Sequence, residues 1–136
     1  MITKLAPNEI FVFGSNTAGR HGRGAALQAR QQFGAVYGIG EGLTGQCYAF
    51  PTLDGSANQL RPVNTHQLRE SRNLLYKTCA TNPDKRFLLT KVGCGLAGYD
   101  EDYMRSFFTR PPDNLILPED WVAINESFRQ QRKNNP

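Results

Sequence analysis

Short apolar runs alternate with stretches of helical periodicity along this chain. Continuous apolar runs are typical of strands that are buried on both faces of a sheet. On that basis we predict four strands, at residues 10–13, 47–50, 87–92 and 115–117. Apolar positions three and four residues apart follow each strand and predict helices that begin near residues 22, 64, 100 and 118. The β-α order predicts a compact three-layer α/β domain with a mostly parallel central sheet flanked by helices.

Polar and turn residues mark the ends of these elements. Pro51 is expected to end the second strand, and residues 53–64 are expected to form an exposed loop. Asn64, with Gln67 three residues later, is typical of a capping box at a helix start. The glycine-rich residues 38–45 are expected to form a mobile loop that closes over a ligand.

The composition is that of one domain with a modest positive charge. The chain has 136 residues, of which 39% are hydrophobic, and this is enough for a single core. We expect one domain over residues 1–128 and a frayed, basic polar tail over residues 129–136. The net charge of +4 favours an anionic partner such as a phosphate. Nucleic-acid binding through the basic tail is a weaker alternative, because no surface of interleaved basic and aromatic residues is visible.

No targeting segment or metal pattern stands out. The apolar runs fall well short of the roughly 20 residues that a membrane span requires, and residues 1–8 lack the apolar core of a signal peptide. We therefore expect a cytoplasmic protein with no membrane partner. Cys47, Cys79 and Cys94 are widely spaced and form no CxxC pair, so reduced thiols are expected rather than a zinc site. We expect the protein to function without a metal ion or a cofactor.

Two glycine-rich loops, at residues 14–24 and 93–98, follow two of the predicted strands, and each leads into a predicted helix. Ligands of open parallel sheets bind beyond the carboxyl ends of the strands, so both loops are expected at one edge. Glycine allows backbone N–H groups to approach a ligand, and a helix N-terminus adds positive potential. The pattern therefore favours a phosphate site over plain tight turns. Neither loop is a Walker A motif, and the first is not the GxGxxG of nicotinamide enzymes.

The sequences of the two loops resemble those of macro domains, including small bacterial and phage macro-like proteins. "GSN" followed by "TAGRHGRGAA" is similar to the first ligand loop of that family, and "KVGCGLAGYDED" is similar to its second phosphate loop. The resemblance implies a macro-like fold that binds ADP-ribose, with Asn16 near the distal ribose and the pyrophosphate held between the loops. The residues expected to contact the ligand are Gly14, Ser15, Asn16, Gly22, Arg23, Gly24, Ala25, Glu41, Gly93, Cys94, Gly95, Leu96, Ala97, Gly98 and Tyr99.

Three residues are candidates for catalysis. His21 lies in the first glycine loop and is able to act as an acid or base near neutral pH, although a loop histidine is more often an idle surface residue. Asn16 and Asp100 are the other two, and Asp100 has the simpler alternative role of a helix N-cap. Cys94 is expected to pack as a small apolar group, because no partner base is evident.

The chain also departs from the macro-domain pattern. The early strands of the family are missing, Phe13-Gly-Ser-Asn16 replaces the usual Asn-Ala-Ala-Asn, and Ala97 stands where the branch that cleaves carboxylate-linked ADP-ribose has an acid. The main hypothesis is hydrolysis of an ADP-ribose linkage on a macromolecule or small molecule, with ADP-ribose or a related nucleotide as ligand. The alternative, which Ala97 favours, is a non-catalytic protein that reads or sequesters such a nucleotide.

Overall fold

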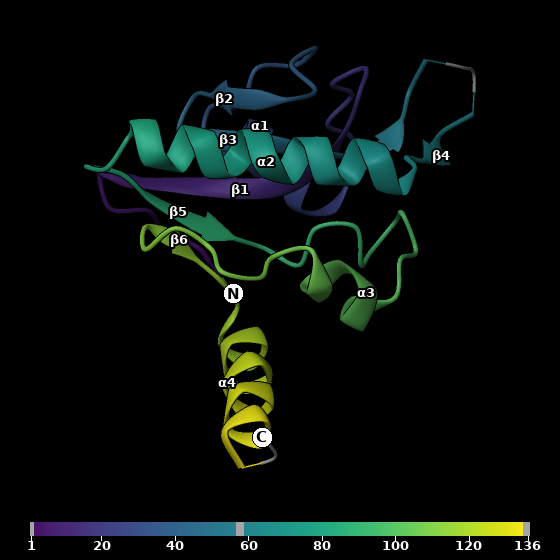
Figure 1. Cartoon of the computed structure of the whole chain (residues 1–136). Helices are drawn as coiled ribbons and strands as arrows, with labels where there is room; N and C mark the ends of the chain where they lie inside the picture. The colour runs from purple at the N-terminus through teal and green to yellow at the C-terminus, as the bar shows by residue number, and fades with distance from the viewer. Residues whose placement is uncertain (1, 57–58, 135–136) are drawn as a thin grey trace.

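The computed structural model describes residues 2–56 and 59–134. Within these residues, six strands and four helices form an α/β fold (Figure 1). The elements in chain order are β1 (Glu9–Asn16), α1 (Gly24–Gln32), β2 (Gly42–Thr44), β3 (Cys47–Asp54), β4 (Arg61–Pro62), α2 (Thr65–Thr81), β5 (Arg86–Leu89), α3 (Glu101–Ser106), β6 (Leu115–Ile116) and α4 (Glu119–Asn134).

The sheet is mixed, and β1 lies at its centre. The strand order is β2-β3-β1-β5-β6, and β4 pairs with the far end of β3. The four predicted strands are all present, and β1 is parallel to β3 and β5, as β5 is to β6. The prediction of a mostly parallel sheet is only partly confirmed, because β2 and β4 are antiparallel additions to β3. The predicted mobile loop at residues 38–45 instead ends in β2, which turns at Gly45 into β3.

Side chains that alternate along the central strands build a core on each face of the sheet. Ile10 and Val12 of β1 join Leu68, Leu75 and Cys79 of α2 in the larger core. The intervening residues Phe11 and Phe13 pack on the other face, with Ala29 of α1. Because α1 and α2 cover opposite faces, the continuous apolar run at residues 10–13 belongs to a strand buried on both sides, as predicted. Figure 1 shows α2 running across the near face.

Three strand boundaries differ from the prediction. β1 continues to Asn16, so residues 14–16 belong to the strand rather than to the predicted loop. β3 continues through Pro51 to Asp54, and Leu53 and Asp54 pair with β4. β2 pairs only with residues 47–49 of β3, so Pro51 lies between the segments that β2 and β4 cover. A proline in this gap costs no ladder hydrogen bond on that side. β5 ends at Leu89, because residues 90–92 already turn into the second glycine loop.

The helix starts agree with the predicted caps. Asn64 and Gln67 form a reciprocal capping box at α2, and the Asp100 carboxylate accepts a hydrogen bond from the Tyr103 amide at α3. The last helix differs from the prediction, because residues 129–134 of the expected tail continue α4. Residues 135 and 136 lie outside the described residues.

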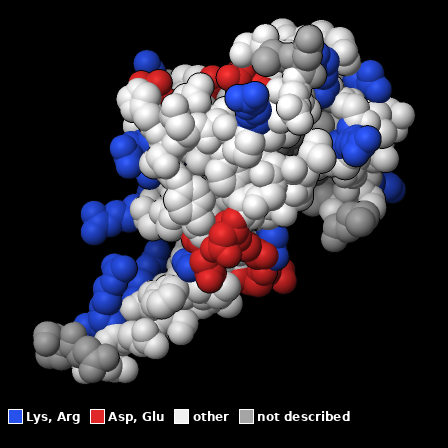
Figure 2. Space-filling view, turned by 90° about the vertical axis from the view of Figure 1, so that its right-hand side faces the viewer, with Lys and Arg blue, Asp and Glu red and all other residues white. Residues whose placement is uncertain are grey.

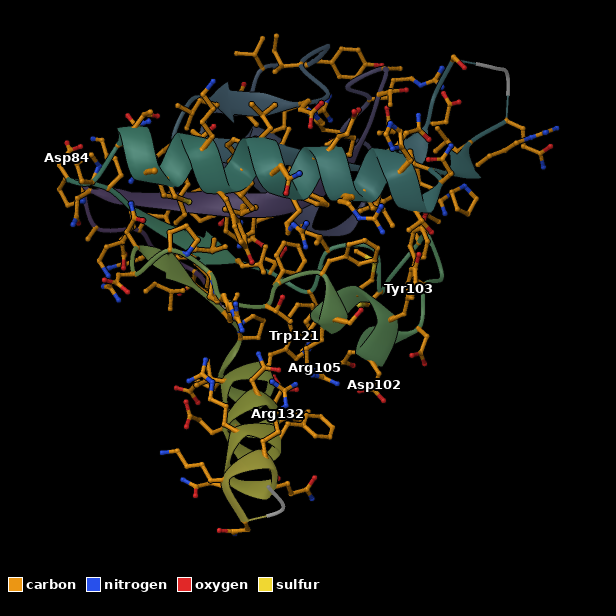
Figure 3. The ribbon with its side chains drawn as sticks, in the orientation of Figure 1. Asp84, Asp102, Tyr103, Arg105, Trp121 and Arg132 are labelled. Atoms are coloured by element: carbon orange, nitrogen blue, oxygen red, sulfur yellow. The ribbon has the colours of Figure 1, made fainter. Side chains whose placement is uncertain are left out.

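Helix α4 is attached to the rest of the protein by its first turns and extends away from the sheet (Figures 1 and 3). Trp121 is completely buried, and its indole N–H donates to Glu101 Oε1 at 2.8 Å. Figure 3 shows Trp121 at the junction of α3 and α4. The first turns of these helices carry the acidic residues Glu101, Asp102, Glu119 and Asp120. The largest group of acidic side chains in Figure 2 lies beside the point where the narrow extension leaves the body.

None of the helices in the described residues is both long and apolar enough to span a membrane.

Residues 36–41, which we call the strap, pack backbone against backbone on the loop that follows β1. The Gly38 amide donates to the Gly19 carbonyl at 2.8 Å. A β-carbon at Gly19, which has a φ of +70°, would lie 2.3 Å from the Gly38 carbonyl carbon. A β-carbon at Gly40 would lie 2.5 Å from the Asn16 carbonyl oxygen. Both positions therefore require glycine so that the two chain segments can touch.

We expect Gly19→Ala to destabilise the protein by about 2 kcal/mol or more, because it adds backbone strain and forces two backbones apart. Gly22→Ala is the matched control in the same loop, since its β-carbon would meet nothing within 4 Å and its φ is not positive. That substitution should leave stability unchanged or raise it by up to about 1 kcal/mol. Urea unfolding of both variants measures the difference, and equal midpoints would contradict the close packing.

Candidate functional site

The carboxyl end of β1 touches the second glycine loop. A β-carbon at Gly14 would lie 3.4 Å from the Gly93 backbone nitrogen and 3.6 Å from the Val92 Cα. This proximity follows from the parallel pairing of β1 with β5, in which Val12 lies opposite Leu89. The two glycine-rich loops, which are far apart in the sequence, therefore meet at one edge of the sheet, as predicted.

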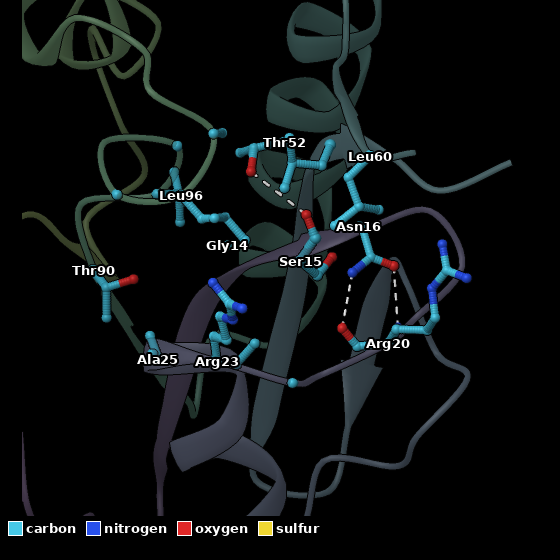
Figure 4. A pocket seen from close by; sticks show the side chains of 18 of the residues that line it. Gly14, Ser15, Asn16, Arg20, Arg23, Ala25, Thr52, Leu60, Thr90 and Leu96 are labelled. Atoms are coloured by element: carbon cyan, nitrogen blue, oxygen red, sulfur yellow. Dashed lines mark hydrogen bonds between the residues drawn. The ribbon is translucent and has the colours of Figure 1, made fainter. Parts of the chain in front are cut away.

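A cavity of about 1030 Å³ opens between these loops (Figure 4). Its walls come from the end of β1, the start of α1, the end of β3 and the loop after β5. The predicted ligand residues that line it are Gly14, Ser15, Asn16, Gly22, Arg23, Gly24, Ala25, Gly93, Gly95, Leu96 and Ala97. The volume is at the upper end of the range for small-molecule sites, which is large enough for a dinucleotide-sized ligand.

The N-terminus of α1 faces this cavity without a capping side chain. Arg23 is the N-cap residue and makes no side-chain cap hydrogen bond, and the first turn holds no acidic residue. The first intrahelical bond runs from the Leu27 amide to the Arg23 carbonyl, so the helix itself leaves the amides of residues 24–26 unbonded. A β-carbon at Gly24 would meet nothing within 4 Å. These amides and the positive end of the helix dipole together favour an anion.

The charged side chains that line the cavity are all cationic within the part of the chain that the structure describes. They are Arg20, Arg23 and Lys91. Lys91 is already neutralised, because its Nζ lies 2.8 Å from Glu101 Oε1 and 2.6 Å from Asp120 Oδ2. These two hydrogen-bonded carboxylates, first Asp120 and then Glu101, raise the pKa of Lys91. The two arginines are therefore the cations left for a ligand, and Figure 4 shows Arg23 pointing toward the end of β1.

The polar side chains at the end of β1 are used to hold the backbone. The Asn16 side-chain amide donates to the Arg20 carbonyl at 2.8 Å, and its oxygen accepts from the Arg20 amide at 3.0 Å (Figure 4). The Ser15 hydroxyl donates to the Gly40 carbonyl. The Thr90 hydroxyl donates to the Val12 carbonyl at 2.8 Å. These residues line the cavity by shaping its loops, and the donors available to a ligand include main-chain amides and the arginines.

His21 does not line the cavity, contrary to its predicted role. The ring is completely buried behind the first loop, where its Nε2 lies 3.0 Å from the Ile39 carbonyl oxygen and its edge packs on Phe13. Burial lowers the pKa of His21, and the backbone hydrogen bond to Ile39 opposes this effect. The sequence places a histidine among cavity glycines but does not show on which side of the loop it points.

Asp100 and Glu41 also lie outside the cavity lining. Asp100 caps α3 through the Tyr103 amide at 3.1 Å, which is the alternative role considered for it. Glu41 is exposed in the strap, whose backbone packs against the outside of the first loop rather than over the cavity. Of the three residues singled out for catalysis, only Asn16 reaches the cavity.

Three further predicted residues belong to the second loop but are absent from the cavity lining. Cys94 is half-buried, packs against the larger core and donates to the Val92 carbonyl at 3.6 Å. Burial raises the pKa of Cys94, in agreement with the expectation of an inert, packed thiol. The Tyr99 hydroxyl donates to the Val63 carbonyl, which fastens the loop to the segment before α2. Gly98 is exposed, with no neighbour within 4 Å of a β-carbon.

Sequence reasoning did not place several other residues that line the cavity. Thr90, Lys91 and Val92 follow the end of β5, and the rule that ligands bind beyond strand ends could have found them. Thr52 and Leu53 were missed because β3 was expected to end at Pro51. Ala26, Gln59 and Leu60 also line the cavity, and for Gln59 and Leu60 the sequence holds no evident signal.

Comparison with protein-family models, with curated proteins and with solved structures finds no match to this chain. Within the described residues, no three His, Cys, Asp or Glu side chains are grouped as they would be around a metal ion. Function is therefore inferred from the chemistry of the cavity and from the motifs that line it.

Proposed function

We propose that this chain binds an ADP-ribose-type nucleotide in the cavity between the two glycine-rich loops. The observation that supports this most directly is the meeting of an uncapped helix N-terminus with a second glycine loop around an arginine-bearing cavity. The macro-domain resemblance of both loops supports the same ligand. The proposal extends to the fold, which we take to be macro-like in its finer details.

The diphosphate would occupy the space between the start of α1 and residues 93–97. On one side stand the amides of residues 24–26, which the helix leaves unbonded. On the other side, the amides of Gly95, Leu96 and Ala97 have no acceptor among the described residues. Two sets of N–H groups in residues that line one cavity suit two adjacent phosphates, each of which offers several acceptor oxygens.

The remainder of the cavity suits the ribose and base of a nucleotide better than a lone phosphate ion. Leu53, Leu60 and Leu96 supply apolar lining, and Leu96 is 65% exposed at the rim. Arg20, which is held by Asn16 and donates to the Gly55 carbonyl at 3.2 Å, lines the cavity as well. Apolar surface with a few placed polar groups is typical of small-molecule sites.

The placement of the candidate catalytic side chains favours binding without cleavage. His21 and Asp100 do not line the cavity, and the Asn16 amide is engaged at both ends by Arg20. Ala97, which replaces the acid of the carboxylate-cleaving macro domains, does line it. We therefore propose a protein that reads or sequesters ADP-ribose or an ADP-ribosylated macromolecule, with hydrolysis as the alternative that the assay below distinguishes.

Calorimetric titration with ADP-ribose should give saturable binding with a dissociation constant below about 1 mM, which corresponds to about −4 kcal/mol. AMP and ribose 5-phosphate, which lack the diphosphate, should bind more weakly. Incubation with an ADP-ribosylated protein should give binding without release of ADP-ribose. Catalytic release would establish the hydrolase alternative, and the absence of binding to any of these ligands would overturn the proposal.

Arg23→Ala and Gly95→Val should each weaken ADP-ribose binding. Removal of a charge-assisted hydrogen bond costs about 1.5–3 kcal/mol, or about ten- to a hundredfold in affinity. At Gly95 a β-carbon would meet nothing within 4 Å and φ is not positive, so valine should obstruct the cavity without straining the fold. Arg86→Ala, at the opposite end of the sheet, is the control and should bind normally. Unchanged affinity in both cavity variants, measured by calorimetry, would contradict the assigned diphosphate position.

A further inference from the structure

Three hydrogen bonds fasten the strap to residues 15–21, which we call the ligand loop. The Gly38 amide donates to the Gly19 carbonyl at 2.8 Å, and the Ser15 hydroxyl donates to the Gly40 carbonyl. Between them, His21 Nε2 lies 3.0 Å from the Ile39 carbonyl oxygen, to which it donates. The chain passes directly from His21 into residues 22–25, which form the cavity wall at the start of α1. Release of the strap would therefore free the backbone that the proposed ligand requires to be fixed.

Of these three hydrogen bonds, the one from His21 is the one that includes a titratable side chain. Its ring lies between Phe13 of β1, at 5.2 Å between ring centroids, and Tyr37 of the strap, at 6.3 Å. From α1, the Arg30 guanidinium lies 5.7 Å from the centre of the Tyr37 ring, and its charge opposes a positive charge on His21. Phe13 and the Ile39 carbonyl bring no charge to the ring. In the described part of the chain, Arg30 and Tyr37 are thus the charged and titratable groups around it, and the charge of Arg30 disfavours imidazolium.

The two ring nitrogens of His21 are unequal. Because Nε2 donates to Ile39, the neutral ring has its free electron pair on Nδ1, which is buried and has no hydrogen-bond partner among the described residues. A second proton would have to occupy Nδ1 in this apolar site without an acceptor. A buried charge without a partner is costly, so protonation favours any arrangement that exposes the ring to water.

We propose that neutral His21 is a positioning residue that holds the strap on the ligand loop, and that protonation of Nδ1 releases the strap and weakens binding of the diphosphate ligand. The effect on the ligand rests on the proposed function, whereas the release of the strap does not.

The direction of the pH effect follows from burial, which lowers the pKa of His21 in the folded protein. The unfolded chain binds a proton at His21 below about pH 6.5, whereas the folded chain does so only at lower pH. Stability should therefore fall as the pH drops below about 6.5, until the folded-state pKa is reached. Below the folded-state pKa the strap is released, and the affinity for ligand should fall by up to about tenfold for each pH unit.

The release of the strap is testable without any ligand. In the intact protein, nitrogen NMR of the histidine rings between about pH 8 and about pH 5 should show His21 as a neutral ring protonated on Nε2 near pH 7. The only other histidine, His66, is exposed and serves as the internal reference. The protection of the Gly38 amide from hydrogen exchange, relative to its intrinsic exchange rate at each pH, should fall as His21 becomes protonated. An ordinary titration of His21 near pH 6.5, or Gly38 protection that does not change while His21 titrates, would overturn the proposal.

The effect on the ligand is tested by ADP-ribose titrations of the wild type, His21→Gln and His66→Gln over the same pH range. Glutamine keeps an N–H donor for the Ile39 carbonyl but takes up no proton, so His21→Gln should bind with pH-independent affinity. The wild type and His66→Gln should both lose affinity at low pH. Equal pH dependence in all three proteins would overturn the positioning role. If ADP-ribose binds at no pH while Gly38 exchange still follows His21 protonation, the proposed ligand is wrong and the release of the strap stands.

Discussion

The parallel pairing of β1 with both β3 and β5 determines where this protein can bind a ligand. β1 is the central strand, and its carboxyl end is flanked by the ends of its two neighbours. The absence of a side chain at Gly14 lets this end approach the Gly93 backbone, where a β-carbon would lie 3.4 Å from the nitrogen. Two walls of the cavity, the start of α1 and the second loop, continue directly from this junction.

The glycines of this chain serve two purposes that the sequence does not separate. Gly19, Gly40 and Gly45 lie where a β-carbon would collide with the backbone of another segment. The absence of a side chain there allows the strap and the turn between β2 and β3 to pack closely. At Gly22, Gly24 and Gly95, which line the cavity, a β-carbon would meet nothing within 4 Å. The first group makes the loop rigid, and the second gives a ligand access to the main chain. A binding loop requires both properties, because exposed amides hold a ligand well only when the backbone that carries them is fixed.

The sequence predicted the order of the central elements and the meeting of the two loops, because both depend on local patterns and on the rules for parallel sheets. The run at Ile10–Phe13 and the capping box at Asn64 are examples of such patterns. It did not predict β4 or the passage of β3 through Pro51, since these depend on which neighbouring strand covers each part of β3. It also misplaced His21, because the direction of a side chain in a glycine-rich loop depends on backbone angles that glycine leaves open.

The small side chains of α1 control how near this helix lies to the sheet. Ala29 is completely buried against the core that contains Phe11 and Phe13, and Ala25 and Ala26 pack on the same core. Because these side chains are small, α1 lies close to the sheet, and its first residues line the cavity together with Gly14. A bulkier residue in the second turn of α1 would push the helix away from the sheet and change the shape of the cavity indirectly. The shape of the cavity thus depends in part on Ala29, whose buried side chain does not line it.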